Sequence, residues 1–302
     1  MLLKDKYRIN ILGLGEVGSA LLTGLVLLGR DTAESIGIYD IKQANTARCE
    51  AEMNQIALAR DPGRFPAVKI IPGEDELFDC DIFIFCASKE VPGIGSGVAD
   101  VRMAQYKDNK MIIEDYARLA ARSSFQGVFA VVSDPVDPLC KAAYLASGLD
   151  HKQFKGFGLG VMNGRALYYA RRDERFSRYI SEGRVFGPHG EDLVVADSIF
   201  NYDDEISREL TKKVVTENLR IRQTGFKPFI APALSSGALS IISMLKGEWH
   251  YSSNYIKDGE GGAFFGALNR ITKQGYELEN HKLPNKLTER LRRSYENLKK
   301  ID

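Results

Sequence analysis

The first half of the chain alternates short apolar runs with longer segments of helical spacing. Five runs of four to six mostly apolar residues have the length of buried strands: residues 8–12, 36–39, 68–71, 81–85 and 127–132. Between them, residues 19–28, 46–59 and 98–121 read as helices. This order predicts a parallel, doubly wound sheet, in which ligands bind at the carboxyl ends of the strands.

The pattern changes around residues 135–138, which separate a predicted nucleotide-binding domain of residues 1–138 from a second domain of residues 139–302. Near the end of the chain, residues 286–300 are rich in charge, but their apolar side chains recur at helical spacing. These side chains belong to Leu287, Leu291, Tyr295 and Leu298. We therefore expect a C-terminal helix docked on the second domain.

Composition excludes several classes of protein. The chain has 302 residues, a net charge of +1 and 44% hydrophobic residues, as expected for an ordinary globular protein with no polyanionic partner such as nucleic acid. No apolar run approaches the roughly 20 residues that span a bilayer, and the N-terminus lacks a signal peptide, so no membrane partner is expected. The cysteines form no CxxC pair, which favours a reducing cytoplasm over disulfides or a zinc site; they are Cys49, Cys80, Cys86 and Cys140.

A glycine-rich turn follows the first predicted strand and opens the first helix. In the stretch Gly13-Leu14-Gly15-Glu16-Val17-Gly18, the first glycine allows the tight turn and the second lets the backbone approach a diphosphate. The third, Gly18, lets the helix pack closely on the strand. The free N–H groups at the helix start suit phosphate oxygens. In this strand–turn–helix context the motif predicts a dinucleotide site.

Asp40 ends the second predicted strand, 22 residues after Gly18. A carboxylate there can accept hydrogen bonds from both ribose hydroxyls of adenosine and would repel a 2′-phosphate. No arginine follows directly, because the next residue is Ile41. The alternative is a turn or cap role for Asp40. The spacing favours NAD over NADP as the cofactor.

Only four histidines are present, and His189 lies in Gly187-Pro188-His189-Gly190 in the half opposite the glycine turn. An imidazole changes charge near neutral pH, so it can pass a proton while a cofactor passes a hydride. A lone histidine is more often structural, and other residues must support a chemical role.

These pieces, in this order, resemble the lactate/malate dehydrogenase superfamily along nearly the whole chain. The resemblance rests on the glycine turn, Asp40, the strand ending at Cys86-Ala87, and four further segments, residues 102–109, 132–137, 158–165 and 187–190. The candidate site residues in these segments are separated by 32, 31 and 24 residues, which fits the spacing of the family's active-site positions; they are Arg102, Asp134, Arg165 and His189.

The resemblance implies a Rossmann domain followed by an α+β substrate domain, NAD contacts at the glycine turn, Asp40, Cys86 and Ala87, and a homodimer or homotetramer. It implies that His189 gives and takes the proton at the substrate's carbonyl or hydroxyl. Arg165 would hold a substrate carboxylate with its planar guanidinium, and Arg102 would polarise the reacting carbonyl when a loop closes.

Two positions depart from the family's pattern. The family pairs its histidine with an aspartate three residues before the carboxylate-binding arginine, and here that position is Met162, which cannot fix a tautomer or stabilise an imidazolium. Asp134 stands where the family has an asparagine that binds substrate. Three explanations are open. The negative charge that Met162 lacks is supplied by Asp134 beside His189, or Asp134 faces a cationic group on an imine substrate, or the protein has lost its activity.

A third departure is the loop of residues 88–101, which is longer than in the family and rich in small residues. A malate enzyme carries an arginine in this loop for the second carboxylate, whereas here the only cation is Lys89. A dicarboxylate substrate is therefore not expected. The sequence predicts an NAD-dependent oxidoreductase acting on a small 2-oxo or 2-hydroxy acid other than malate. The alternatives are a 2-imino acid reductase that uses Asp134 and a non-catalytic NAD-binding protein.

Overall fold

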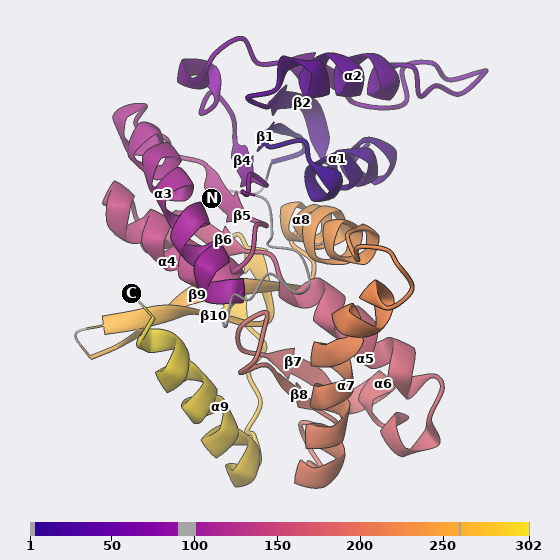
Figure 1. Cartoon of the computed structure of the whole chain (residues 1–302), viewed down its shortest axis with the longest axis vertical. Helices are drawn as coiled ribbons and strands as arrows, with labels where there is room; N and C mark the ends of the chain where they lie inside the picture. Colours follow the sequence, from indigo (N-terminus) through magenta and orange to yellow (C-terminus); the bar gives the residue numbers. More distant parts are fainter. Residues whose placement is uncertain (1–3, 90–100, 260, 302) are drawn as a thin grey trace.

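The computed structural model describes residues 4–89, 101–259 and 261–301, and of residues 101–104 it describes the backbone alone. A nine-stranded mixed sheet in the order β11-β10-β9-β6-β5-β4-β1-β2-β3 runs through the described part of the chain, beside a two-stranded sheet of β7 and β8. Figure 1 shows the sheet between two sets of helices, with the smaller sheet beneath it among α5, α6 and α7.

The elements begin and end as follows. The strands are β1 (Tyr7–Leu12), β2 (Ala33–Tyr39), β3 (Ala67–Ile70), β4 (Ile82–Phe85), β5 (Val128–Val131), β6 (Phe154–Gly156), β7 (Arg184–Phe186), β8 (Val194–Ala196), β9 (His250–Asp258), β10 (Gly261–Thr272) and β11 (Gly275–Leu278). The helices are α1 (Glu16–Leu28), α2 (Gln43–Asn54), α3 (Val101–Arg122), α4 (Val136–Ser147), α5 (Leu159–Ala170), α6 (Tyr179–Glu182), α7 (Asp204–Arg222), α8 (Ser240–Leu245) and α9 (Asn285–Lys299), with a π-helix η4 (Pro232–Leu239) leading into α8.

Strands β1 to β6 are parallel, which confirms the predicted doubly wound arrangement. The strand order reverses between β1 and β4, because β2 and β3 extend the sheet on one side and β5 and β6 on the other. Leu12 and Phe85 pair at this reversal, at the carboxyl ends of the two strands. In sheets of this kind the crevice at such a point is the ligand site.

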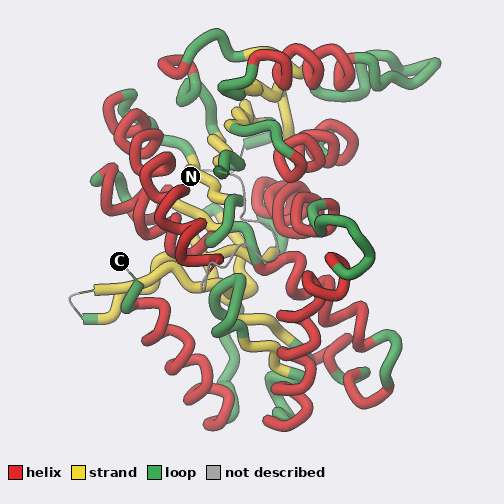
Figure 2. Tube along the Cα trace, viewed as in Figure 1, coloured by secondary structure: helices red, strands yellow, loops and turns green. Residues whose placement is uncertain are grey.

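Side chains on β4 explain why both faces of the sheet are covered. Ile82 and Ile84 point into one apolar cluster, which includes α1 and α8, and Phe83 and Phe85 point into another, which includes α3 and α4. A strand that is buried on both faces reads as a continuous apolar run rather than an alternating one. Figure 2 shows the helices on both sides of the strands.

Helix α2 ends at Asn54, whereas the sequence pattern predicted a helix to residue 59. The Asn54 side chain accepts a hydrogen bond from the Val68 N–H and donates one to the Val68 carbonyl, at 3.0 and 2.9 Å. This tie to the edge strand β3 fixes the end of the helix, and no hydrophobic period could reveal it.

The second half of the chain extends the same sheet. Strand β9 pairs antiparallel with β6, and β10 and β11 follow it to the edge. The predicted boundary at residue 138 thus falls between β5 and β6, inside the region that the sheet spans, and the division into two domains stays a prediction. The predicted C-terminal helix is confirmed as α9, in which Leu287 and Leu298 are buried.

No helix in residues 4–89, 101–259 or 261–301 has the length and apolar character required to cross a bilayer. The four cysteines are buried free thiols. In the same described residues, no group of three or more histidine, cysteine, aspartate or glutamate side chains is placed to hold a metal ion.

Candidate active site

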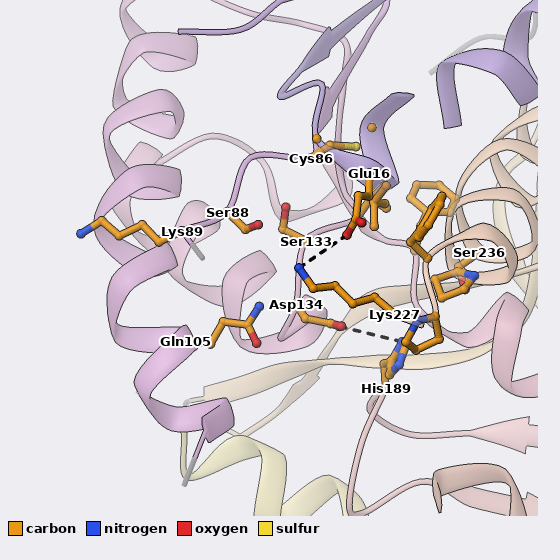
Figure 3. A pocket seen from close by; sticks show the side chains of 18 of the residues that line it. Glu16, Cys86, Ser88, Lys89, Gln105, Ser133, Asp134, His189, Lys227 and Ser236 are labelled. Atoms are coloured by element: carbon orange, nitrogen blue, oxygen red, sulfur yellow. Dashed lines mark ion pairs between the residues drawn. The ribbon is translucent and has the colours of Figure 1, made fainter. Parts of the chain in front are cut away.

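A cavity of about 560 Å³ lies between the glycine turn and the second half of the chain. Figure 3 shows its side chains converging from both halves. The described residues that line it are Gly15, Glu16, Val17, Gly18, Cys86, Ser88, Lys89, Gln105, Val132, Ser133, Asp134, Phe157, His189, Arg222, Lys227, Pro228, Phe229, Pro232 and Ser236. The sequence predicted seven of these as site residues: Gly15, Glu16, Val17, Gly18 and Cys86 as cofactor contacts, and Asp134 and His189 as catalytic residues.

The glycine turn fits a dinucleotide diphosphate. Gly13 has φ +92°, and a Cβ there would lie 2.7 Å from the Ala87 nitrogen, so only glycine lets β1 and β4 end side by side. A Cβ on Gly15, by contrast, would have nothing within 4 Å, which leaves its face open to a ligand. Gly15 is also the N-cap of α1, and in the described chain no side chain caps that helix. The free N–H groups of its first turn are therefore available to phosphate oxygens.

Asp40 is held rigidly at the end of β2, beside the glycine turn. Its two carboxylate oxygens accept hydrogen bonds from the backbone N–H groups of Leu14 and Lys42, at 2.7 and 2.8 Å. The carboxylate therefore has a structural role, and it also keeps lone pairs for ribose hydroxyls, since each oxygen can accept more than one hydrogen bond. These residues together fit an NAD molecule that enters along the glycine turn.

His189 lies on the segment between β7 and β8, with its side chain 15% exposed at the cavity. Its backbone N–H donates to the Asp137 carboxylate at 3.1 Å. A Cβ on Gly158 would lie 2.7 Å from the His189 Cβ and 2.9 Å from Nδ1, so a larger residue at position 158 would displace the ring. The imidazole is thus fixed by its surroundings and not by its own segment alone.

Asp134 stands beside the imidazole. Its Oδ1 lies 3.9 Å from His189 Nδ1, which is within ion-pair range but longer than a hydrogen bond (Figure 3). The Asp134 side chain is 51% exposed, so it also faces the cavity. Met162, which stands at the family's aspartate position, is instead 2% exposed within an apolar cluster of the second half.

Asn109 and Asp137 support this pair, and the sequence analysis singled out neither. Asn109 is fully buried; it donates to the Asp134 carbonyl at 2.9 Å and accepts from the Lys89 N–H at 3.0 Å. It thereby joins the two segments that carry Ser88 and Asp134. Asp137 lies in the first turn of α4, and burial raises the pKa of its carboxyl from 3.8 to about 7. Two carboxyl groups therefore lie near His189, one half exposed and one buried.

Asp137→Asn should change how stability depends on pH. Because the folded-state pKa of Asp137 is raised, its contribution to stability is fully present below about pH 4 and is lost as pH rises through about 7. Asparagine keeps an oxygen acceptor for the His189 N–H but cannot ionise. Urea unfolding at about pH 5 and pH 8 should show the variant gaining stability relative to wild type at the higher pH. An equal difference in unfolding free energy between the variant and wild type at both pH values would contradict the raised pKa of Asp137.

Arg165 does not line the cavity that holds His189. It faces a second cavity of about 720 Å³, which adjoins the first, because Lys227, Pro228, Phe229 and Pro232 line both. Arg165 is 8% exposed, its Nη1 donates to the Val214 carbonyl at 3.2 Å, and burial lowers its pKa. Among the described residues no carboxylate is within the 4.0 Å of an ion pair with Arg165, although the Glu217 carboxylate lines the same cavity and favours its charged form. A buried guanidinium of this kind is poised to accept an anion.

Two further predictions fall on residues whose placement is not described. Arg102 lies in the first turn of α3, and its side chain is outside the description. Of the predicted substrate loop, residues 90–100 are also outside it. Ser88 and Lys89, which precede this stretch, and Gln105, which follows it, all line the cavity.

Comparison with known proteins gives the same family as the sequence motifs. Residues 7–156 match the family model described as lactate/malate dehydrogenase, NAD binding domain. The L-lactate dehydrogenase of Treponema denticola is 29% identical over 197 residues, and L-lactate dehydrogenase 1 of Lactobacillus acidophilus is 27% identical over 186 residues. These matches cover 65% and 61% of this chain but only 59% and 54% of the relatives, so the chain matches less than two thirds of their length.

Solved structures match over nearly the whole chain. A minor L-lactate dehydrogenase from Enterococcus mundtii, in a ligands-bound form, aligns with a TM-score of 0.80 and 19% identity over 99% of this chain and 98% of that one. The malate dehydrogenase of Archaeoglobus fulgidus in complex with NADH aligns with a TM-score of 0.75 and 20% identity over 96% and 97%. At this identity the likeness shows the fold.

Proposed function

Since the chain belongs to the lactate/malate dehydrogenase superfamily, we propose that it is an NAD-dependent oxidoreductase acting on a small 2-oxo or 2-hydroxy acid other than malate. The observation that carries the proposal is the approach of the Asp134 carboxylate to within 3.9 Å of the His189 imidazole, in the cavity that begins at the glycine turn. A binding protein without catalysis has no need of a proton donor with an anionic partner.

NAD, when bound, supplies or accepts the hydride at the carbon next to the substrate's carboxylate. His189 donates a proton to the carbonyl oxygen in reduction and removes it from the hydroxyl in oxidation. Asp134, facing Nδ1, favours the tautomer with the proton on that nitrogen, so the proton is exchanged through Nε2. Its negative charge also stabilises the imidazolium, which takes over the role that Met162 cannot perform.

Arginines would hold the acid. The buried Arg165 has no ion-pair partner within 4.0 Å among the described residues, and a substrate carboxylate reaching it past Lys227 to Pro232 would supply one. Arg102, at the start of α3, would polarise the reacting carbonyl on closure. The absence of arginine from residues 88–101 argues against a second substrate carboxylate at the loop, and hence against malate.

Reduction of a 2-imino acid is the second candidate. The half-exposed carboxylate of Asp134 favours it, because an anion that faces the cavity could stabilise a positively charged iminium nitrogen. In that case Asp134 would act on the substrate as well as on His189.

We also expect a homodimer or homotetramer, since closed symmetric assemblies are the common form of soluble enzymes.

The proposal is tested by following NADH oxidation with a panel of 2-oxo acids, each with and without ammonium or a small amine. Turnover without amine supports the oxo-acid reaction, whereas turnover that requires amine supports the imine reaction. NADH binding without oxidation by any member of the panel would overturn both and leave a binding protein.

The preference for NADH over NADPH should depend on Asp40. We expect Asp40→Asn to weaken NADH binding about tenfold, because a charge-assisted hydrogen bond to the ribose becomes a neutral one, and to narrow the preference over NADPH. Fluorescence titration of both cofactors measures this. Asp31→Asn, an exposed aspartate just before β2, is the matched control. If Asp40→Asn kept the wild-type preference for NADH over NADPH, Asp40 would have only a structural role, through its hydrogen bonds with Leu14 and Lys42.

A further inference from the structure

Lys227 reaches across the cavity from the second half of the chain to the glycine turn. It follows α7 and the turn at Gly225, and its Nζ lies 4.0 Å from the Glu16 carboxylate (Figure 3). Glu16 is the first residue of α1 and directly follows Gly15. Both side chains line the cavity, and both are more than half exposed. No sequence pattern marks Lys227 as a site residue.

An exposed ion pair at this distance contributes little to stability, so its position needs another explanation. The diphosphate of a dinucleotide carries two negative charges, and the open face of Gly15 places it next to the Glu16 carboxylate. The two charges of the diphosphate and the Glu16 carboxylate repel one another unless a cation lies between them. Among the cations that line this cavity in the described structure, which include Lys89 and Arg222, Lys227 is the one in ion-pair range of Glu16.

We propose that Lys227 is a cofactor-binding residue whose ammonium group lies between Glu16 and the diphosphate and donates hydrogen bonds to the phosphate oxygens. This rests on the proposed function only in taking NAD as the cofactor. An ammonium has three donors, so contact with one phosphate oxygen does not require Lys227 to leave Glu16. Glu16 in turn keeps the lysine directed into the cavity when no cofactor is bound.

The position of Lys227 along the chain gives this contact a second effect. Lys227 begins the segment with Pro228, Phe229 and Pro232 that separates the His189 cavity from the Arg165 cavity. A diphosphate that holds Lys227 therefore also holds the wall beside which the acid must bind.

The test measures dissociation constants of NADH by fluorescence and of ADP-ribose by calorimetry, so it does not depend on turnover. The proteins are wild type, Lys227→Met, Glu16→Gln and the double variant, with Lys273→Met in the β10–β11 turn as the control lysine. We expect Lys227→Met to weaken both ligands about tenfold, because ADP-ribose shares the diphosphate. Glu16→Gln should tighten them a few-fold by removing the repelling charge.

The double variant distinguishes direct contact between Lys227 and the diphosphate from mere neutralisation of the Glu16 charge. If Lys227 binds the diphosphate, its removal still weakens binding in the Glu16→Gln background. If Lys227 only neutralises Glu16, the effect of its removal disappears there, and the inference is overturned. An affinity of Lys227→Met equal to wild type overturns it as well. Failure of wild type to bind either ligand would instead refute the assignment of NAD, and with it the proposed function.

Discussion

Replacement of His189 by asparagine should lower kcat about a thousandfold while NADH binds as it does to wild type. General acid–base catalysis by a positioned side chain contributes roughly 10²- to 10⁴-fold, and asparagine can form hydrogen bonds but cannot exchange a proton near neutral pH. The backbone N–H that donates to Asp137 is retained in the variant, so the local structure has no reason to change.

The measurement is steady-state NADH oxidation with the best acid of the panel, together with NADH affinity. His151→Asn is the matched control, because His151 is a half-exposed histidine in a short helix before β6, and it should leave kcat unchanged. More than a tenth of the wild-type kcat in His189→Asn would remove His189 from the role of proton donor.

Asp134→Asn should have the second largest effect, a fall in kcat of about a hundredfold or more. The amide has nearly the same shape as the carboxylate, but it places no negative charge beside Nδ1, and it can hold the imidazole in the wrong tautomer. In enzymes with a Ser-His-Asp triad, the same aspartate-to-asparagine exchange beside the catalytic histidine lowers kcat about 10⁴-fold. The distance of 3.9 Å, longer than a hydrogen bond, suggests a smaller loss here.

The division of the loss between kcat and KM decides what Asp134 does. If it acts through His189, kcat falls for an oxo acid and KM changes little. If it binds an iminium nitrogen, the loss is greatest in the reaction that contains amine, and much of it is in KM. Asp75→Asn, an exposed aspartate in a short helix before β4, is the control. Wild-type kcat in both reactions would contradict a role for the Asp134–His189 pair.

Local patterns predicted the parts of the molecule that depend on neighbours in the sequence. The run of residues 8–12, the glycine turn and Asp40 lie where the pattern put them, because strand length, turn chemistry and the spacing to the next strand are local properties. The end of α2 was wrong by five residues, since Asn54 is tied to Val68, which is distant in sequence.

The same distinction between local sequence properties and long-range packing applies to the candidate site. The sequence raised the possibility that Asp134 stands beside His189, but only the packing of α4 and the β7–β8 connection brings them within 3.9 Å. The sequence grouped Arg165 with His189, whereas the structure separates their cavities by Lys227 to Pro232. The sequence assigned no role to Asp137, whose raised pKa comes from burial, or to Lys227, whose approach to Glu16 comes from its position in the fold.

The most direct test of the central claim is transfer of deuterium from NADH deuterated at the nicotinamide C4. The labelled cofactor is incubated with the 2-oxo acid panel, with and without ammonium, and the products are analysed by mass spectrometry. The account predicts a 2-hydroxy acid, or a 2-amino acid where ammonium is required, with one deuterium at C2 that is absent from the His189→Asn reaction. Tight NADH binding without a deuterated product from any acid would contradict it.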